Sequence, residues 1–141
     1  MNLLFVFADE LRGAALGCAP DPRSHYPEPS RAQTPHLDRL AAAGVRFTQA
    51  VANSAVCTPA RGSILTGCWP QTHRALANDL PVDPGAPSIA RSLGAAGYRC
   101  GYIGKWHLGG MPRDRFVPPG PERLGFDRLD RLDRLDHHPP A

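Results

Sequence analysis

The chain has 141 residues, a length typical of one domain, and glycine and proline together supply about a fifth of them, which predicts many turns. Hydrophobic residues make up 42% of the sequence, enough for a packed core and too many for a disordered or collagen-like chain. The formal net charge of +3 comes from basic and acidic residues scattered without a basic block, so we expect no nucleic-acid partner.

The first predicted element is the continuous apolar run at residues 3–8. An apolar run without alternation is typical of a strand that is buried on both faces of a parallel sheet. The run is too short for a signal peptide, and no apolar run approaches the roughly 20 residues of a membrane span. We therefore expect a cytoplasmic protein with no membrane partner.

The second predicted element is a helix that begins after Thr34 and ends at Gly44. The Thr34 hydroxyl can cap free N–H groups, and Pro35 suits the first helical position because its missing N–H costs nothing there. A strand is predicted directly afterwards, at residues 45–52. The apolar stripe of this helix is expected to consist of Leu37, Leu40 and Ala41.

A second helix and strand repeat this order. Ser88 opens the helix, Gly97 ends it, and a strand is predicted at residues 98–103. The expected apolar face of this helix consists of Ile89, Leu93 and Ala96. Strands alternating with helices are typical of an α/β fold with a parallel sheet and right-handed crossovers.

The last part of the chain is a repeat. Residues 127–136 read Asp-Arg-Leu three times and then Asp, and His137 and His138 follow. Leucines spaced by three drift around a helix and give a poor apolar stripe. We therefore predict a low-complexity tail at 127–141, with a solvated histidine pair, after a domain at 1–126.

The first segment that suggests chemistry is the pair Asp9 and Glu10, directly after the first predicted strand. In an α/β enzyme, the site lies at the carboxyl ends of the strands. Adjacent carboxylates offer hard oxygen ligands for Ca²⁺ or Mg²⁺. The alternative is that Asp9 caps a turn and Glu10 faces solvent.

The second segment runs from Cys57 to Arg61. Pro59 lies near the start of a predicted short helix that Gly67 ends, so Cys57 is expected at the helix N-terminus, where free N–H groups attract anions. Arg61 can add a forked, permanently charged donor. This arrangement is suited to attack on a sulfate or phosphate ester, and the alternative is that Cys57 is a small buried apolar residue.

The third segment contains Lys105 and His107 between glycines. Lys105 is the single lysine among 16 basic residues, and its compact ammonium can point at one oxygen where a guanidinium cannot. His107 can move a proton near neutral pH. On an extended segment both side chains project to one face, although a chance surface pair is the alternative.

Several minor candidates have ordinary interpretations. His73 is expected at the surface or as a capping residue, with a place beside the reactive cysteine as the alternative. Trp69 and Trp106 are expected to pack in the core.

Taken in order, these segments closely resemble the N-terminal part of the sulfatase family, within the alkaline-phosphatase-like superfamily. The resemblance runs from residue 2 to about residues 126–127. The motifs that carry it are Asn2-Leu3-Leu4-Phe5-Val6-Phe7-Ala8-Asp9-Glu10, Thr34-Pro35-His36-Leu37-Asp38-Arg39-Leu40-Ala41, Cys57-Thr58-Pro59-Ala60-Arg61, Ile64-Leu65-Thr66-Gly67, Ala96-Gly97-Tyr98 and Gly104-Lys105-Trp106-His107-Leu108-Gly109.

The resemblance implies a three-layer α/β/α sandwich with a mostly parallel central sheet, alkaline-phosphatase-like and incomplete in this chain. It implies a sulfuric ester hydrolase acting on a small sulfate ester, in which a formylglycine-generating or sulfatase-maturing enzyme oxidises Cys57 to formylglycine. The hydrated aldehyde is the nucleophile in this family, which splits one difficult step into two.

The same resemblance implies roles for the other candidates. Arg61 would hold the hydrate, Lys105 the sulfate oxygens, and His107 would bond the nucleophilic hydroxyl. Asp9, Glu10 and the modified Cys57 would bind a divalent cation, Ca²⁺ in most of the family, with Mg²⁺ as the alternative. Glu10 departs from the family, where a shorter ligand is usual.

Further metal ligands, a leaving-group acid and a second lysine that the family supplies downstream are not identifiable here. We therefore expect an incomplete catalytic domain with little or no turnover by the chain alone. The alternatives are a phosphate or phosphonate monoester hydrolase of the same superfamily and a non-catalytic remnant.

Overall fold

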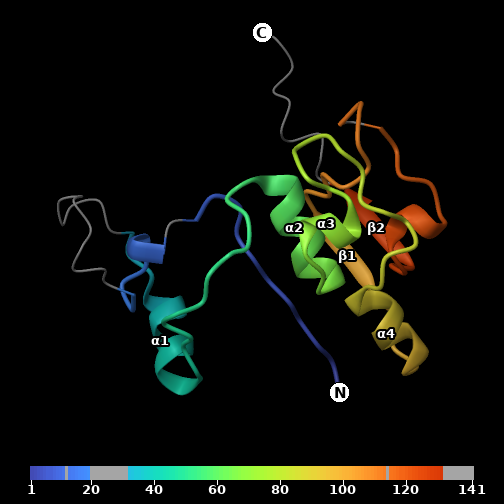
Figure 1. The fold of residues 1–141 in the computed structure, drawn as a ribbon. Coiled ribbons are helices and arrows are strands. Elements are labelled where there is room, and N and C mark those ends of the chain that lie inside the picture. Colours follow the sequence, from blue (N-terminus) through green and yellow to red (C-terminus); the bar gives the residue numbers. More distant parts are fainter. Residues whose placement is uncertain (12, 20–31, 114, 132–141) are drawn as a thin grey trace, which may run out of the picture. The chain divides into compact units, whose positions relative to one another are not determined.

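The computed structural model describes residues 1–11, 13–19, 32–113 and 115–131 (Figure 1). The chain divides into two compact units, Met1–Val51 and Ala52–Ala141. Within the described ranges, no helix combines the length and the apolar character that crossing a membrane requires.

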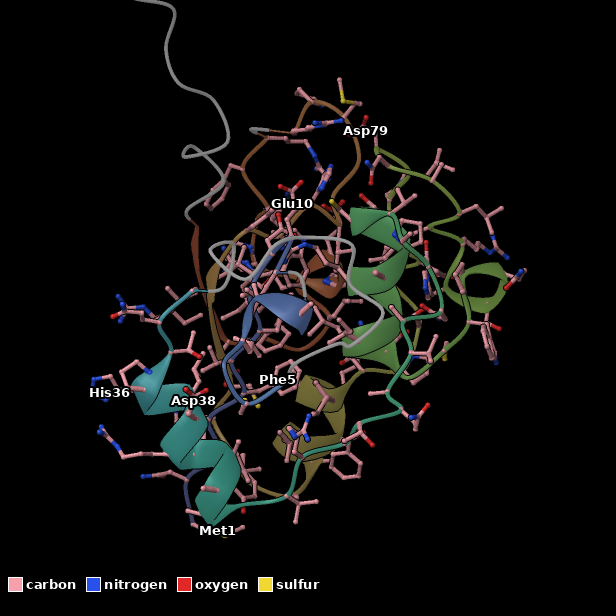
Figure 2. The ribbon with its side chains drawn as sticks, turned by 90° about the vertical axis from the view of Figure 1, so that its left-hand side faces the viewer. Met1, Phe5, Glu10, His36, Asp38 and Asp79 are labelled. Carbon is pink, nitrogen blue, oxygen red and sulfur yellow. The ribbon has the colours of Figure 1, made fainter. Side chains whose placement is uncertain are left out.

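The first unit contains η1 (Gly13–Ala15) and α1 (Pro35–Ala43). The predicted helix after Thr34 is therefore confirmed, but the Thr34 side chain makes no cap to the helix backbone. Its hydroxyl donates to Asp38 Oδ1 at 2.9 Å and accepts the Gly17 N–H at 2.9 Å. Asp38, labelled beside His36 on α1 in Figure 2, also accepts the Cys18 N–H. Thr34 and Asp38 thus fasten a distant turn to the start of the helix.

The strands predicted at residues 3–8 and 45–52 are not formed in this structure, and that prediction is wrong. Most of these side chains are exposed, including Phe5, which Figure 2 labels, and Phe47. The predicted leucine stripe of α1 is exposed as well, since the helix buries no residue. A strand buried on both faces needs neighbouring strands for its backbone and helices for its side chains. The described part of this unit forms no strand, and its helix α1 buries no residue.

The second unit carries the sheet and most of the helices. Its elements are α2 (Cys57–Thr66), α3 (Pro70–His73), α4 (Ile89–Ala95), β1 (Gly101–Gly104), η3 (Pro121–Arg123) and β2 (Arg128–Arg131). β1 and β2 form a parallel pair, in which Tyr102 lies opposite Leu129 (Figure 1). The parallel direction of this pair agrees with the α/β prediction.

The predicted helix after Ser88 is confirmed as α4. The Ser88 hydroxyl accepts the Arg91 N–H at 3.1 Å, the expected N-cap, and donates to the Leu124 carbonyl. The predicted apolar face is wrong, because Ala90 is the buried residue of this helix and Ile89 is exposed. The Ala90 carbonyl accepts a hydrogen bond from Cys100 Sγ at 3.6 Å, so this face of the helix lies against the segment before β1.

The strand predicted at 98–103 begins later, at Gly101. Before it, Cys100 exchanges hydrogen bonds with Asp127: its N–H donates to Asp127 Oδ2 at 3.0 Å, and its carbonyl accepts the Asp127 N–H at 2.9 Å. This side-chain contact replaces a regular strand pairing at Cys100.

β2 lies inside the segment predicted as a tail. Leu129, the first leucine of the repeat, is buried, with 9% of its surface exposed. The start of the repeat therefore belongs to the packed unit. Residues 132–141, which include His137 and His138, lie outside the described residues.

One apolar cluster lies at the centre of the second unit. It contains Leu65, Ala75, Val82, Trp106, Leu108, Val117, Leu124 and Leu129. Tyr102 and Phe126 pack against it, and their rings meet Trp106 edge-on at centroid distances of 5.0 and 6.0 Å. Edge-to-face aromatic contacts fix ring orientation beyond simple burial. The segment that directly follows β1 is thereby anchored through Trp106, as predicted for that residue.

Candidate active site

Helix α2 presents Cys57 as its first residue. Pro59 suits the first turn because the missing N–H has no partner to lose. Gly67 ends the helix at φ 69°, donating its N–H to the Ser63 carbonyl at 2.9 Å. The predicted position of Cys57 at a helix N-terminus is confirmed, and its side chain is a half-buried free thiol.

Thr58 ties this helix start to two other segments. It is fully buried; its N–H donates to Asn78 Oδ1 and its hydroxyl donates to the His107 carbonyl, both at 3.0 Å. One of the helix N–H groups expected to attract an anion is therefore already bound to a side chain. The same contacts bring Cys57, the loop around Asn78 and the segment after β1 together.

Arg61 lies one turn further along α2 and is buried, with 5% of its surface exposed. Its guanidinium Nη1 donates to the Lys105 carbonyl at 2.8 Å and to the Tyr102 hydroxyl at 3.2 Å. The Tyr102 hydroxyl donates to the same carbonyl at 2.5 Å. Arg61 thus holds the backbone of Lys105 in place and puts a permanent positive charge next to the Lys105 carbonyl and the Tyr102 hydroxyl.

Lys105 and His107 are half-buried, and the residues between and after them, Trp106 and Leu108, are buried. The His107 side chain has only 7% of its surface exposed, and the prediction that it shares one face with Lys105 stays a prediction. The expected extended backbone is wrong at His107, which has φ 54°, in the left-handed region. Non-glycine residues adopt that region rarely, so the turn there is imposed by its surroundings.

Asp79 lies within reach of His107. His107 Nε2 is 3.4 Å from Asp79 Oδ1, and Arg113 binds the same carboxylate with both prongs, at 2.6 and 2.9 Å (Asp79 is labelled in Figure 2). The Arg113 hydrogen bonds lower the pKa of Asp79 to about 2, with a smaller contribution from His107. The carboxylate is therefore ionised at neutral pH.

His73 is a buried structural residue, and the expectation of a surface position is wrong. Its Nδ1 lies 3.3 Å from the Ala75 N–H and its Nε2 lies 3.1 Å from the Ser63 hydroxyl. Burial lowers its pKa from the ordinary value of 6.5. A neutral ring bonded at both nitrogens packs α3 against α2. Trp69, which was expected to pack, has 67% of its surface exposed.

The carboxylates of Asp9 and Glu10 belong to the first unit and are exposed. Glu10 has φ 56°, so the chain turns sharply at this pair. Two adjacent exposed carboxylates supply the hard oxygen donors that Ca²⁺ and Mg²⁺ prefer, and this donor set fits such a cation. The combination of Asp9 and Glu10 with Cys57 in one metal site stays a prediction.

Sequence reasoning missed Asn78, Asp79, Tyr102 and Arg113. The available signal was weak: an Asn-Asp pair in a loop is a common turn former, and Asp79 indeed has φ 70°. Nothing in the spacing of these residues predicts that Asp79 lies beside His107, Asn78 beside Thr58 or Tyr102 beside Arg61. Their contact depends on how the loops fold back over α2.

Comparison with known proteins gives the family of this chain. A family model described as Sulfatase matches residues 1–139. The chain is 43% identical over 126 residues to an ulvan-active sulfatase of Formosa agariphila, covering 89% of this chain and 23% of that protein. It is 40% identical over 134 residues to human arylsulfatase A, covering 91% of this chain and 24% of that protein.

Two solved structures have the same fold. One, named as a sulfatase of Bacteroides fragilis, matches with a TM-score of 0.69 and 33% identity over 84% of this chain and 28% of that one. The other, a phosphonate monoester hydrolase of Agrobacterium radiobacter, has a TM-score of 0.66 and 28% identity over 89% of this chain and 24% of that one. The predicted α/β class is thereby confirmed, and this chain spans about a quarter of the length of these relatives. The protein belongs to the sulfatase family.

Proposed function

We propose that this chain is the nucleophile-bearing part of a sulfuric ester hydrolase. The observation that carries the proposal is the position of Cys57, at the start of α2 and joined through Thr58 to the segment that bears Lys105 and His107. Membership of the sulfatase family supports a sulfate ester as the substrate class. The chain spans only about a quarter of the length of these relatives. Sulfate ester hydrolysis by the protein is therefore part of what we propose.

The proposed nucleophile is formed from Cys57. A separate maturing enzyme, with an external oxidant, would convert its Cβ to an aldehyde with loss of the sulfur, and water would then hydrate the aldehyde. One hydroxyl of the hydrate gives its proton to His107 and attacks sulfur, the S–O bond to the alcohol breaks, and the alcohol leaves with a proton taken from water. The second hydroxyl loses its proton, the aldehyde re-forms, and sulfate is expelled.

The cationic residues around Cys57 are proposed to bind the sulfate group. Lys105 would hold a sulfate oxygen as a point charge, and Arg61 would hold the hydrate while it fixes the Lys105 backbone. His107 would accept the proton of a hydrate hydroxyl and so act as a general base. A divalent cation held by Asp9, Glu10 and the hydrate would stabilise the negative charge that develops on the sulfate oxygens.

The alternative substrate class is a phosphate or phosphonate monoester. The likeness to a phosphonate monoester hydrolase shows that the fold is shared, but the sequence relatives named above are sulfatases, which favours sulfate. A non-catalytic remnant is the second alternative, and it predicts an unmodified thiol at Cys57.

Mass spectrometry of the peptide that contains Cys57 tests the proposal. After co-expression with a formylglycine-generating enzyme, we expect the aldehyde at Cys57 and an unmodified thiol at Cys68, which is a matched control in the same helical region. The variant Cys57→Ala should carry no aldehyde anywhere. A thiol at Cys57 under conditions that convert a known sulfatase would contradict the proposal.

A further inference from the structure

The Asp79 carboxylate is clamped between a guanidinium and an imidazole. Arg113 donates to both of its oxygens, at 2.6 and 2.9 Å, and His107 Nε2 lies 3.4 Å from Oδ1. The last contact is a long hydrogen bond, and contacts of catalytic groups commonly shorten once a substrate is bound. The forked contact with Arg113 fixes the plane of the Asp79 carboxylate. It therefore also fixes the direction in which Oδ1 faces His107 Nε2.

The charge of Asp79 decides which atom carries the proton. An ionised carboxylate is an acceptor only, so His107 Nε2 has to be the donor in this pair. In a neutral imidazole, a proton on Nε2 leaves Nδ1 as an acceptor. Asp79 therefore sets the tautomer of His107 as well as the orientation of its ring.

The other ring nitrogen is the second observation. The His107 side chain has only 7% of its surface exposed, and its Nδ1 is buried with no hydrogen-bond partner within the described part of the chain. Leaving a buried polar atom unpaired costs free energy, so such atoms in folded proteins call for an explanation. A ligand group with a hydroxyl would satisfy this nitrogen.

The backbone on both sides of the contact is strained. Asp79 has φ 70° and His107 has φ 54°, so two non-glycine residues in the left-handed region face each other. Such conformations persist only where surrounding contacts hold them. Thr58 holds the His107 carbonyl, and Arg113 holds the Asp79 side chain.

We propose that Asp79 is a positioning residue that holds His107 with its proton on Nε2 and its Nδ1 aimed, as an acceptor, at the hydroxyl of the nucleophile. The identity of that hydroxyl rests on the proposed function, whereas the tautomer does not. Arg113 neutralises the Asp79 charge, so the carboxylate can lie near a site for an anionic ester without repelling it. During turnover, Nδ1 takes the hydroxyl proton and Nε2 keeps its own.

The tautomer can be measured directly on the unmodified 141-residue chain. Proton–nitrogen correlation spectra of the imidazole rings at pH 8 distinguish a protonated Nε2 from a protonated Nδ1, and the variant His107→Gln identifies the signals of this ring. We expect Nε2–H in the wild-type chain. A protonated Nδ1 would overturn the proposal without any variant.

Two substitutions at one position supply the matched comparison. Asp79→Asn keeps an oxygen acceptor and should retain the Nε2–H signal. Asp79→Leu removes the acceptor, so the Nε2–H signal should disappear or the ratio of Nδ1–H to Nε2–H should rise at least several-fold. Asp83→Ala removes a carboxylate of the same loop that contacts Arg74 and not His107, and should leave the ring unchanged. An unchanged His107 spectrum in Asp79→Leu would overturn the proposal.

These outcomes are separate from those of the proposed function. The spectra are recorded with Cys57 unmodified. Failure to find formylglycine would therefore contradict the sulfatase proposal without contradicting the proposed tautomer of His107. A protonated Nδ1 together with formylglycine at Cys57 would sink the inference about Asp79 alone.

Discussion

Two buried polar side chains, Thr58 and His73, hold the residues of the site in place. Thr58 binds Asn78 and the His107 carbonyl, so a single threonine joins three segments that are distant in sequence. His73 joins α3 to α2 through the Ser63 hydroxyl. Each side chain is fully buried and hydrogen-bonded, the state in which a polar group stabilises a fold.

The burial of His73 makes the stability of the second unit depend on pH. Burial lowers the pKa of His73 in the folded chain below 6.5, so at a pH between the two values the unfolded chain binds a proton at this ring that the folded chain does not bind. The contribution of the neutral His73 ring to the free energy of unfolding is complete above about pH 6.5 and is lost as the pH falls from there towards the folded-state pKa. We expect the urea midpoint to fall between pH 8 and pH 5 by more in the wild type than in His73→Asn.

The control for this prediction is His36→Asn, because His36 is exposed on α1. This variant should keep the pH dependence of the wild type. Equal slopes in the wild type and His73→Asn would show that His73 contributes nothing to the effect.

At the scale of elements, the two glycines inside α2 and α4 differ in their surroundings. A Cβ on Gly62 would lie 2.6 Å from Cε1 of the buried His73 ring, whereas a Cβ on Gly94 would meet nothing within 4 Å. Alanine favours a helix over glycine by roughly 0.5–1 kcal/mol where there is room for it. The close approach of α2 to α3 therefore explains the glycine at position 62.

The matched substitutions should have opposite signs. Gly62→Ala should lower the free energy of unfolding by about 1–3 kcal/mol, since a crowded core has to shift to admit the methyl group. Gly94→Ala should raise it by roughly 0.5–1 kcal/mol. Denaturant titrations of the two variants measure both effects, and a stabilising Gly62→Ala would contradict the packing described here.

For the molecule as a whole, β2 brings the start of the repeat into the packed unit. Leu129 is buried against the central cluster, while Ile103 on the paired strand β1 has 77% of its surface exposed. A two-stranded sheet is marginal by itself, so the side chains that it buries carry its stability.

Leu129→Ala should lower the free energy of unfolding by about 2–4 kcal/mol, the cost of removing a buried leucine side chain. Ile103→Ala should change it by less than about 0.5 kcal/mol, since an exposed side chain loses little contact. Thermal or urea unfolding measures the difference. If the two variants were equally stable, the first leucine of the repeat would not belong to the core.

The sequence by itself determined helices α1, α2 and α4 and the family, whereas it did not predict α3. Pro35, Ser88 and Gly67 are local signals for helix starts and ends. The ordered motifs around Cys57 and Lys105 identify a sulfatase because each motif depends on neighbours in sequence. The predicted strands at 3–8 and 45–52 failed, since a strand is formed by partners that its own residues do not specify.

Only the tertiary structure decided which loop side chains meet His107. Asp79 meets His107 from 28 positions away, Arg113 binds the same carboxylate, and no periodicity connects these residues. The same holds for Leu129, whose burial in β2 overrides the appearance of a low-complexity repeat. Short-range signals encode backbone conformation, because they act through adjacent residues. Contacts between loops depend on how the whole chain closes around its core, and sequence spacing carries no record of that closure.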